Sequence, residues 1–329
     1  MEIQSVDSEN VGEDSSEHAI SPVATIKWNS LDLDCIKETI ERLDRDGYDD
    51  TIHLVSFGGW NGPHLDAKLS ATEWFQVWQE SAGNVFHGID WDLEGHDDLQ
   101  SPTNIFTIQC LEKMGCISRL AKEKGYIIGM APPQSYLDTA SPKFSRSVNL
   151  VEPDRAWHPE FHYFGANVYA YLLANYENYI DFCSIQFYES YSRAAMSIYG
   201  PEKQSPEDYL ESYVKNLVTQ GETVQVNFAE DRSTGLGNMR VRLRLSKLVL
   251  GFANGWALDT GEKALFVVPQ AIRKAYDNLL MGGKAPRGFM FWVIGEEGKN
   301  DISFTSALNS ILQIRATSTC NSAPQEKEL

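Results

Sequence analysis

Short β-rich apolar runs alternate with helical patterns along most of this sequence of 329 residues. We expect six strands, at residues 52–57, 85–93, 125–131, 180–187, 245–252 and 287–293. Strands that alternate with helices form parallel β/α units, and six such units are more than a small doubly wound sheet needs. The expected fold is therefore an α/β barrel of the (β/α)8 TIM type, with a doubly wound sheet as the alternative.

Two of the expected helices have clear start signals. Ser70 has Glu73 three residues further on, which makes a capping box, and Ser205 directly precedes a proline. We expect helices at residues 31–43, from 70, at 101–124, 161–179, from 205, at 269–280 and at 302–314, and a hairpin within 222–244.

The composition divides the chain into three parts. Residues 1–22 are acidic and Ser-rich and are expected to lack fixed structure, residues 23–315 are expected to form the barrel, and residues 316–329 are a polar tail. An eight-stranded barrel needs two strands before Ile52, but only residues 23–28 offer a weak candidate. We therefore expect a barrel that lacks its first one or two β/α units, and its open sheet edges predict poor folding.

The net charge of −18 disfavours nucleic acid and anionic membranes as partners, because both attract clustered Lys and Arg. The same acidity can equally serve solubility alone. No apolar run reaches the roughly 18 residues of a membrane span, and no secretory signal pattern is present. The five cysteines lack metal-ligand spacing and disulfide-scaffold density. We expect a monomer without metal or cofactor, and its localisation stays open.

Residues 86–94 place carboxylates on alternate positions of an otherwise apolar run. In a strand, Asp90, Asp92 and Glu94 share one face, about 6 to 7 Å apart, and the apolar residues between them share the other. Burying such groups costs several kcal/mol each unless they are hydrogen-bonded, so stability alone would not select them. Mutual repulsion should raise at least one pKa, which makes Glu94 a candidate general acid.

Two other interpretations of this run are open. A calcium loop would begin with Asp90, Asp92, Glu94 and Gly95, but its twelfth position, which should be Glu, is Ser101. An amphipathic edge strand with a solvated acidic face is the second. The edge strand leaves the motifs on the other strands unexplained.

Barrel enzymes carry their chemistry at the carboxyl ends of the strands. Those ends hold Ser56, Gly58, Gly59 and Trp60 on the first strand, Met130 on the third, Gln186 and Tyr188 on the fourth, and Trp292 on the last. Taken singly, the glycines could make a tight turn and the aromatic residues could fill the core. Together they predict a sugar site with a flat apolar floor, polar positioning groups and carboxylates.

At these residues the sequence resembles glycoside hydrolase family 18, the chitinases and their relatives. The family signature, Asp-x-x-Asp-x-Asp-x-Glu at the end of barrel strand four, is matched by residues 87–94 except at its first acid. The Ser-x-Gly-Gly element at 56–59, the Gln-x-Tyr element at 186–188 and the late Trp292 extend the resemblance. It covers residues 52 to about 314.

The resemblance implies hydrolysis of β-1,4-linked N-acetylglucosamine polymers with retained configuration, because the substrate's own acetamido group is the nucleophile. It implies that Glu94 donates the proton to the glycosidic oxygen, that Asp92 orients the acetamido group, and that Asp90 tunes Asp92. Tyr188 would donate a hydrogen bond to the acetamido oxygen, and Trp292 would form the floor under the reacting sugar. Gln186 and Met130 would line the same subsite. The implied partners are chitin or N-acetylglucosamine oligosaccharides, and family members are secreted.

His87 stands where the signature has its first acid, and its odd separation from Asp90 predicts that it faces the helices and affects packing rather than chemistry. Relatives also cleave the chitobiose core of N-glycans with the same acids, and others bind sugar as lectins. Such lectins usually lack the terminal Glu, which is present here as Glu94.

Overall fold

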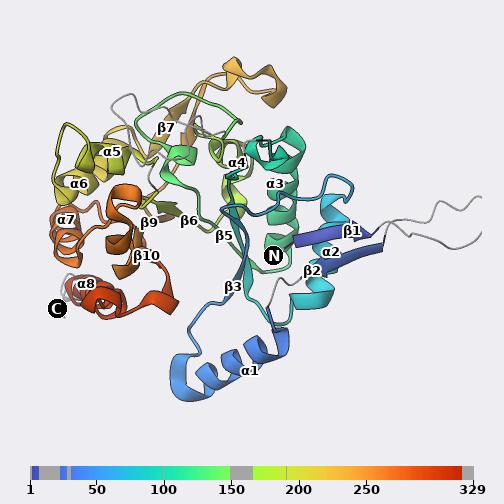
Figure 1. Cartoon of the computed structure of the whole chain (residues 1–329), viewed down its shortest axis with the longest axis horizontal. Coiled ribbons are helices and arrows are strands. Elements are labelled where there is room, and N and C mark those ends of the chain that lie inside the picture. Colours follow the sequence, from blue (N-terminus) through green and yellow to red (C-terminus); the bar gives the residue numbers. More distant parts are fainter. Residues whose placement is uncertain are drawn as a thin grey trace, which may run out of the picture.

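A computed structural model describes residues 2–6, 23–27, 31–98, 100–148, 166–189 and 191–320. Its central sheet has six strands in the order β10-β9-β6-β5-β4-β3, all parallel. They are β3 (Leu54–Gly59), β4 (Gly88–Leu93), β5 (Ile127–Met130), β6 (Phe182–Gln186), β9 (Leu248–Ala253) and β10 (Gly288–Trp292). Spatial order follows chain order without the reversal of a doubly wound sheet. The sheet curls into a half-barrel, and among the described residues β3 and β10 remain its unpaired edges (Figure 1).

Helices follow the strands, as the alternating pattern predicts. They are α1 (Leu33–Leu43), α2 (Ala71–Ala82), α3 (Ile108–Glu123), α4 (Ala170–Tyr176), α5 (Arg193–Tyr199), α6 (Pro206–Thr219), α7 (Pro269–Met281) and α8 (Phe304–Cys320). The capping box at Ser70 and Glu73 and the Ser205 cap are confirmed. In the part that the structure describes, no helix has the length and apolar character to cross a membrane.

The helix expected from Ser101 begins later, at Ile108. Ser101 caps only a short 3-10 turn, Pro102–Asn104, after which the backbone of Ile105 is extended. Thr107 then accepts a hydrogen bond from Cys110 N and caps α3. The predicted start of the helix was therefore wrong, because two successive segments each carry a suitable cap residue.

The two N-terminal strands are not part of the barrel. Strands β1 (Glu2–Val6) and β2 (Val23–Lys27) pair only with each other, antiparallel, so residues 2–6 have a structure that the acidic composition did not predict. The remaining N-terminal residues, 7–22, lie outside the described part. The hairpin expected within 222–244 is confirmed as β7 (Thr223–Val226) and β8 (Met239–Arg242). Helix α8 continues through Cys320, so the expected tail at 316 begins inside a helix.

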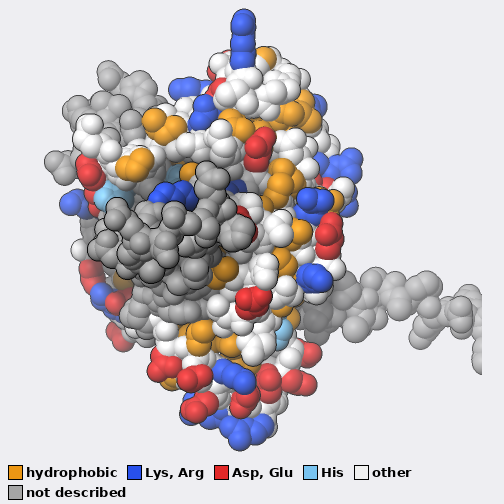
Figure 2. Space-filling model, turned by 90° about the vertical axis from the view of Figure 1, so that its right-hand side faces the viewer, with side chains coloured by type: hydrophobic (Ala, Val, Ile, Leu, Met, Phe, Trp, Pro, Cys, Tyr) orange, Lys and Arg blue, Asp and Glu red, His pale blue; other side chains and the backbone are white. Residues whose placement is uncertain are grey.

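The outer face of the sheet packs on α2 through large aromatic side chains. Trp74 contacts Phe57 at 4.7 Å and Trp91 at 5.8 Å between ring centroids, and all three side chains are buried. Truncating a buried Trp to Ala costs about 3 to 5 kcal/mol. This packing fixes β3 and β4, whose opposite face carries the acids. The surface at α1, by contrast, carries interspersed charges of both signs (Figure 2).

Candidate active site

Strand β4 separates its side chains as the alternation predicts. Ile89, Trp91 and Leu93 are fully buried in the apolar core, and the carboxylates of Asp90 and Asp92 point to the inner face. Because Asp90 and Asp92 belong to β4 and Glu94 directly follows it, the calcium-loop interpretation does not describe these acids. Within the described ranges no group of three His, Cys, Asp or Glu side chains is placed to hold a metal ion.

Two glycines on the neighbouring strands make room for the acids. A Cβ on Gly58 would lie 2.4 Å from the carbonyl oxygen of Asp92, and Gly58 also has a φ of +112°. A Cβ on Gly129 would lie 2.5 Å from Oδ1 of Asp90. Any larger residue at either position would displace the row of carboxylates formed by Asp90, Asp92 and Glu94. The role of Gly58 is thus to allow close approach of the backbone.

Hydrogen bonds connect the row to other strands. Ser56 Oγ on β3 donates to Asp90 Oδ2 at 3.1 Å. Gln186 Nε2 on β6 lies 2.7 Å from Asp92 Oδ1 and 3.5 Å from Glu94 Oε1, and it also donates to the carbonyl oxygen of Ala131. The Gln186 amide therefore fixes the two outer carboxyl groups relative to the sheet.

A pocket of about 560 Å³ opens over the outer two acids. It is lined by Gly59, Trp60, Asp92, Glu94, Gln186, Tyr188, Glu189, Trp256, Thr260, Lys263, Ala264 and Trp292. Trp60 and Trp292 are 40% and 54% exposed, large values for indole side chains, whereas Glu94 is only 4% exposed. The pocket thus combines exposed flat apolar surfaces with a buried carboxyl group, which is the composition expected of a sugar site.

Four of the expected site residues lie outside this lining. Ser56, Gly58 and Asp90 sit deeper on the strands, where they support the row. Met130 is fully buried in the core and pairs in register with Trp91, so it follows the parity of the apolar face. The structure does not bring Met130 to the acids, since Gly129 occupies the inward position beside Asp90.

Burial sets the protonation of the acids. It raises the pKa of Glu94 well above its ordinary value, and the nearby charges of Asp92 and Glu189 raise it further. Burial, and then repulsion from Asp90, likewise raises the pKa of Asp92. Burial raises the pKa of Asp90 to about 6, against the opposing hydrogen bond from Ser56. Burial thus favours the protonated form of Glu94, which is the form that a general acid needs.

Reasoning from the sequence missed five lining residues, namely Glu189, Trp256, Thr260, Lys263 and Ala264. Glu189 adds a fourth carboxyl group, whose pKa burial raises to about 7. Trp256 packs edge-on against Tyr188 at 6.5 Å, and its Nε1 donates to the carbonyl oxygen of Trp292 at 2.7 Å. Lys263 brings a cation to the rim. Trp256 could have been found, because it follows the strand at 245–252 as the other site residues follow theirs.

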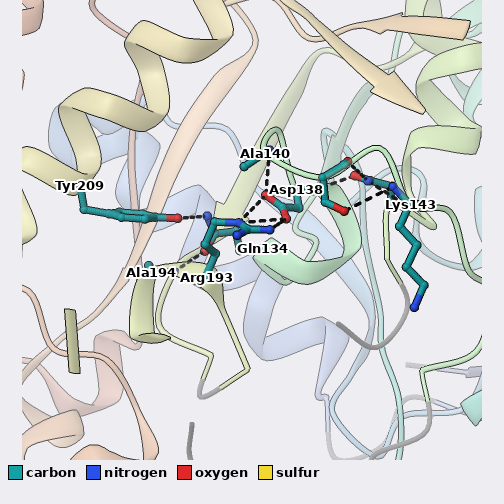
Figure 3. A network of polar contacts seen from close by, with 9 residues as sticks. Gln134, Asp138, Ala140, Lys143, Arg193, Ala194 and Tyr209 are labelled. Atoms are coloured by element: carbon teal, nitrogen blue, oxygen red, sulfur yellow. Dashed lines mark hydrogen bonds and ion pairs between the residues drawn. The ribbon is translucent and has the colours of Figure 1, made fainter. Parts of the chain in front are cut away.

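An ion pair between Asp138 and Arg193 anchors the segment that follows β6 (Figure 3). Arg193, the first residue of α5, lies 2.8 Å from Oδ2 of Asp138, whose carboxylate is fully buried. Gln134 accepts from Ala194 N at 2.9 Å and donates to the hydroxyl of Tyr209 at 2.5 Å. These contacts tie the start of α5 and α6 to the segment that follows β5.

His87 lies away from the acids. It is exposed, its Nδ1 accepts from His53 N at 2.9 Å, and the two imidazole rings stack at 5.6 Å. The departure from the family signature at this position therefore falls on a residue that takes no part in the pocket.

No family model matches the sequence, and no curated protein matches it. Solved structures do match the fold. A GH18 chitinase from Pseudoalteromonas aurantia is 17% identical, with 84% of this chain and 80% of that chain covered and a TM-score of 0.45. A Group IV chitinase from Ostrinia furnacalis in complex with allosamidin is 13% identical (86% and 83% covered, TM-score 0.46). A chitinase from Chromobacterium violaceum is 12% identical (88% and 86% covered, TM-score 0.46).

Proposed function

We propose that this protein hydrolyses β-1,4-linked N-acetylglucosamine polymers or oligomers with retained configuration, as a chitinase. The observation that carries the proposal is the buried Glu94, which lies beside Asp92 in a pocket walled by exposed indoles, and whose pKa burial raises well above its ordinary value. A proton donor with a raised pKa next to a second carboxyl group is the arrangement that glycosidic cleavage needs.

In the first step Glu94 gives its proton to the glycosidic oxygen, and the bond from that oxygen to the anomeric carbon breaks. The acetamido oxygen of the same sugar attacks the anomeric carbon and forms a cyclic oxazolinium ion. Asp92 accepts a hydrogen bond from the acetamido N–H and stabilises the positive charge that develops there. Tyr188, whose pKa burial raises well above its ordinary value, acts as a neutral hydroxyl donor to the acetamido oxygen.

In the second step the Glu94 carboxylate takes a proton from water, and the water oxygen attacks the anomeric carbon. The bond to the acetamido oxygen breaks, so the acetamide is restored and Glu94 is protonated again. Two displacements at one carbon give a product with the β configuration of the substrate. Trp292 offers the apolar face on which the reacting sugar lies, and Gln186 keeps Asp92 in place.

The test is incubation of the folded protein with a fluorogenic chitotrioside, followed by proton NMR of the first products. We expect release of the fluorophore and a β anomer that precedes mutarotation. An α anomer would contradict the mechanism. Binding without turnover would favour a lectin, and release of glycans from a glycoprotein with chitin untouched would favour an N-glycan endoglycosidase.

A further inference from the structure

The backbone that carries Glu94 is held on its two sides in different ways. On one side β3 pairs with β4 up to Gly59 and Leu93, and Asn61 N donates to Gly95 O at 3.0 Å. On the other side the pairing with β5 ends earlier, and side chains take over. The bond from Ala131 N to the carbonyl oxygen of Trp91, at 2.8 Å, joins β5 to β4 three residues before Glu94. Beyond it, three side chains bind three successive residues: Tyr169 donates its hydroxyl to Leu93 O at 3.0 Å, His64 Nε2 lies 2.9 Å from Glu94 O, and Gly95 N donates to the Tyr136 hydroxyl at 3.1 Å.

The three rings share one support. The ring centroids of His64, Tyr136 and Tyr169 lie 4.3, 5.9 and 6.1 Å from that of Phe106, which is fully buried. We call these four residues the Phe106 cradle. They come from the loop after β3, the segment after β5, the residues before α4 and the loop before α3. Four separate parts of the chain thus meet under one turn.

The carboxyl group of Glu94 has few direct restraints. Its contact with Gln186 is 3.5 Å long, and the carboxyl groups of Asp92 and Glu189 are its other charged neighbours. The reach of a side chain with so few contacts is set by its backbone. A displacement of about 1 Å at a reacting group can lower a rate by roughly 10²-fold.

We propose that His64, Tyr136 and Tyr169 are positioning residues that fix the Glu94 backbone so that its carboxyl proton reaches the glycosidic oxygen. The catalytic part of this proposal rests on the proposed function, because the proposed hydrolysis is the reaction in which Glu94 gives up its proton.

The protonation of the cradle suits this task. A carbonyl oxygen only accepts hydrogen bonds, so the His64 proton must lie on Nε2. Burial lowers the pKa of His64 to about 4, so the ring is neutral above that pH. Burial also raises the pKa of Tyr136 and Tyr169 well above the ordinary value. The three hydrogen bonds therefore keep the same form across the neutral range.

The first test removes one hydrogen bond at a time and keeps the ring, in His64→Phe, Tyr136→Phe and Tyr169→Phe. We expect kcat on chitotrioside to fall by about 10- to 100-fold while KM changes less than about twofold, because the change affects proton transfer and leaves the binding surface alone. His64→Gln, which keeps an N–H donor, should recover part of the loss. If kcat, KM and the melting temperature all fell together, the proposal would be overturned.

The matched control is Tyr276→Phe on α7. Tyr276 is buried, and its hydroxyl has no hydrogen-bond partner in the described part of the chain. This variant should keep both kcat and KM. The second test combines each cradle variant with Glu94→Gln. If the cradle acts through Glu94, the cradle variants should lower the residual rate no further. Independent, multiplying losses would contradict the positioning role.

A third readout does not need turnover. In protein with ¹³C-labelled Glu carboxyl groups, the Glu94 titration should move toward the ordinary pKa of Glu in the cradle variants, because a looser turn admits water. It should stay unchanged in Tyr276→Phe. If the wild type fails to cleave chitotrioside but these shifts occur, the proposed function fails and the positioning of Glu94 stands. An unchanged Glu94 titration in all three variants would overturn the positioning itself.

Discussion

The two walls of the pocket are built in opposite ways. On the β4 wall, Glu94 is 4% exposed and the backbone around it is bound by the Phe106 cradle. On the β9–β10 wall, Trp292 is 54% exposed, and its carbonyl oxygen accepts hydrogen bonds from the Trp256 indole and from Asn254 N. The next residue but one, Ile294, is 70% exposed.

The difference follows from what each wall must do. Proton transfer needs a desolvated group at a fixed position, which burial and many hydrogen bonds supply. Stacking on a sugar ring needs open apolar area, which an exposed indole provides. Changes on the β4 wall should therefore act on kcat, and changes on the β9–β10 wall should act on KM.

The largest effect is expected from Glu94→Gln. The amide keeps the shape of the side chain but has no proton to transfer, so turnover of chitotrioside should fall by about 10² to 10⁴-fold. Binding of the oligosaccharide, measured by tryptophan fluorescence, should be kept. Near-normal turnover would remove Glu94 from the role of general acid.

A smaller loss is expected from Asp92→Asn on the same wall. The neutral amide no longer stabilises the charge that develops on the acetamido group, so kcat should fall by about 10- to 100-fold. Steady-state kinetics on chitotrioside would measure it. If KM rose instead and kcat stayed constant, Asp92 would be a binding residue and the contrast between the walls would fail.

On the opposite wall, Trp292→Ala should raise KM about tenfold, since the stacking surface is lost, and should leave kcat within a few-fold. The control is Met281→Ala, which removes another exposed apolar side chain, 81% exposed, outside the pocket lining. A large loss in kcat alone for Trp292→Ala would show that this wall also aligns the reacting atoms.

The smallest effect concerns stability and pH. Asp90 and Glu189 have folded-state pKa values raised to about 6 and about 7, so the folded protein binds more protons than the unfolded chain between about pH 4 and 7. The free energy of unfolding should therefore fall as pH rises through that range. For Glu189 the fall is roughly 1 to 3 kcal/mol.

Urea denaturation at pH 4.5 and 7.5 would measure this change. Glu189→Gln should flatten the dependence, because the amide does not titrate. A stability that rises with pH in the wild type would show that these carboxyl groups are better solvated than their burial indicates.

The sequence predicted the parts of the fold that depend on local periodicity. Alternation placed Asp90, Asp92 and Glu94 on one face of a strand, and the same rule explains why Met130, one position from Gly129, turns away from them. Local caps predicted where α2 and α6 begin. At α3 the rule failed, since the chain uses Thr107 rather than Ser101 as the cap of the long helix.

Contacts between distant segments were decided only by the tertiary structure. His64, Tyr136 and Tyr169 lie 30, 41 and 76 positions from the backbone groups that they bind, and no period in the sequence connects such residues. The sequence also could not show that residues 2–6 pair with residues 23–27, so that residues 23–27 do not join the barrel sheet. Strand parity needs only neighbouring residues, whereas the cradle exists because the curled sheet brings four segments to one end.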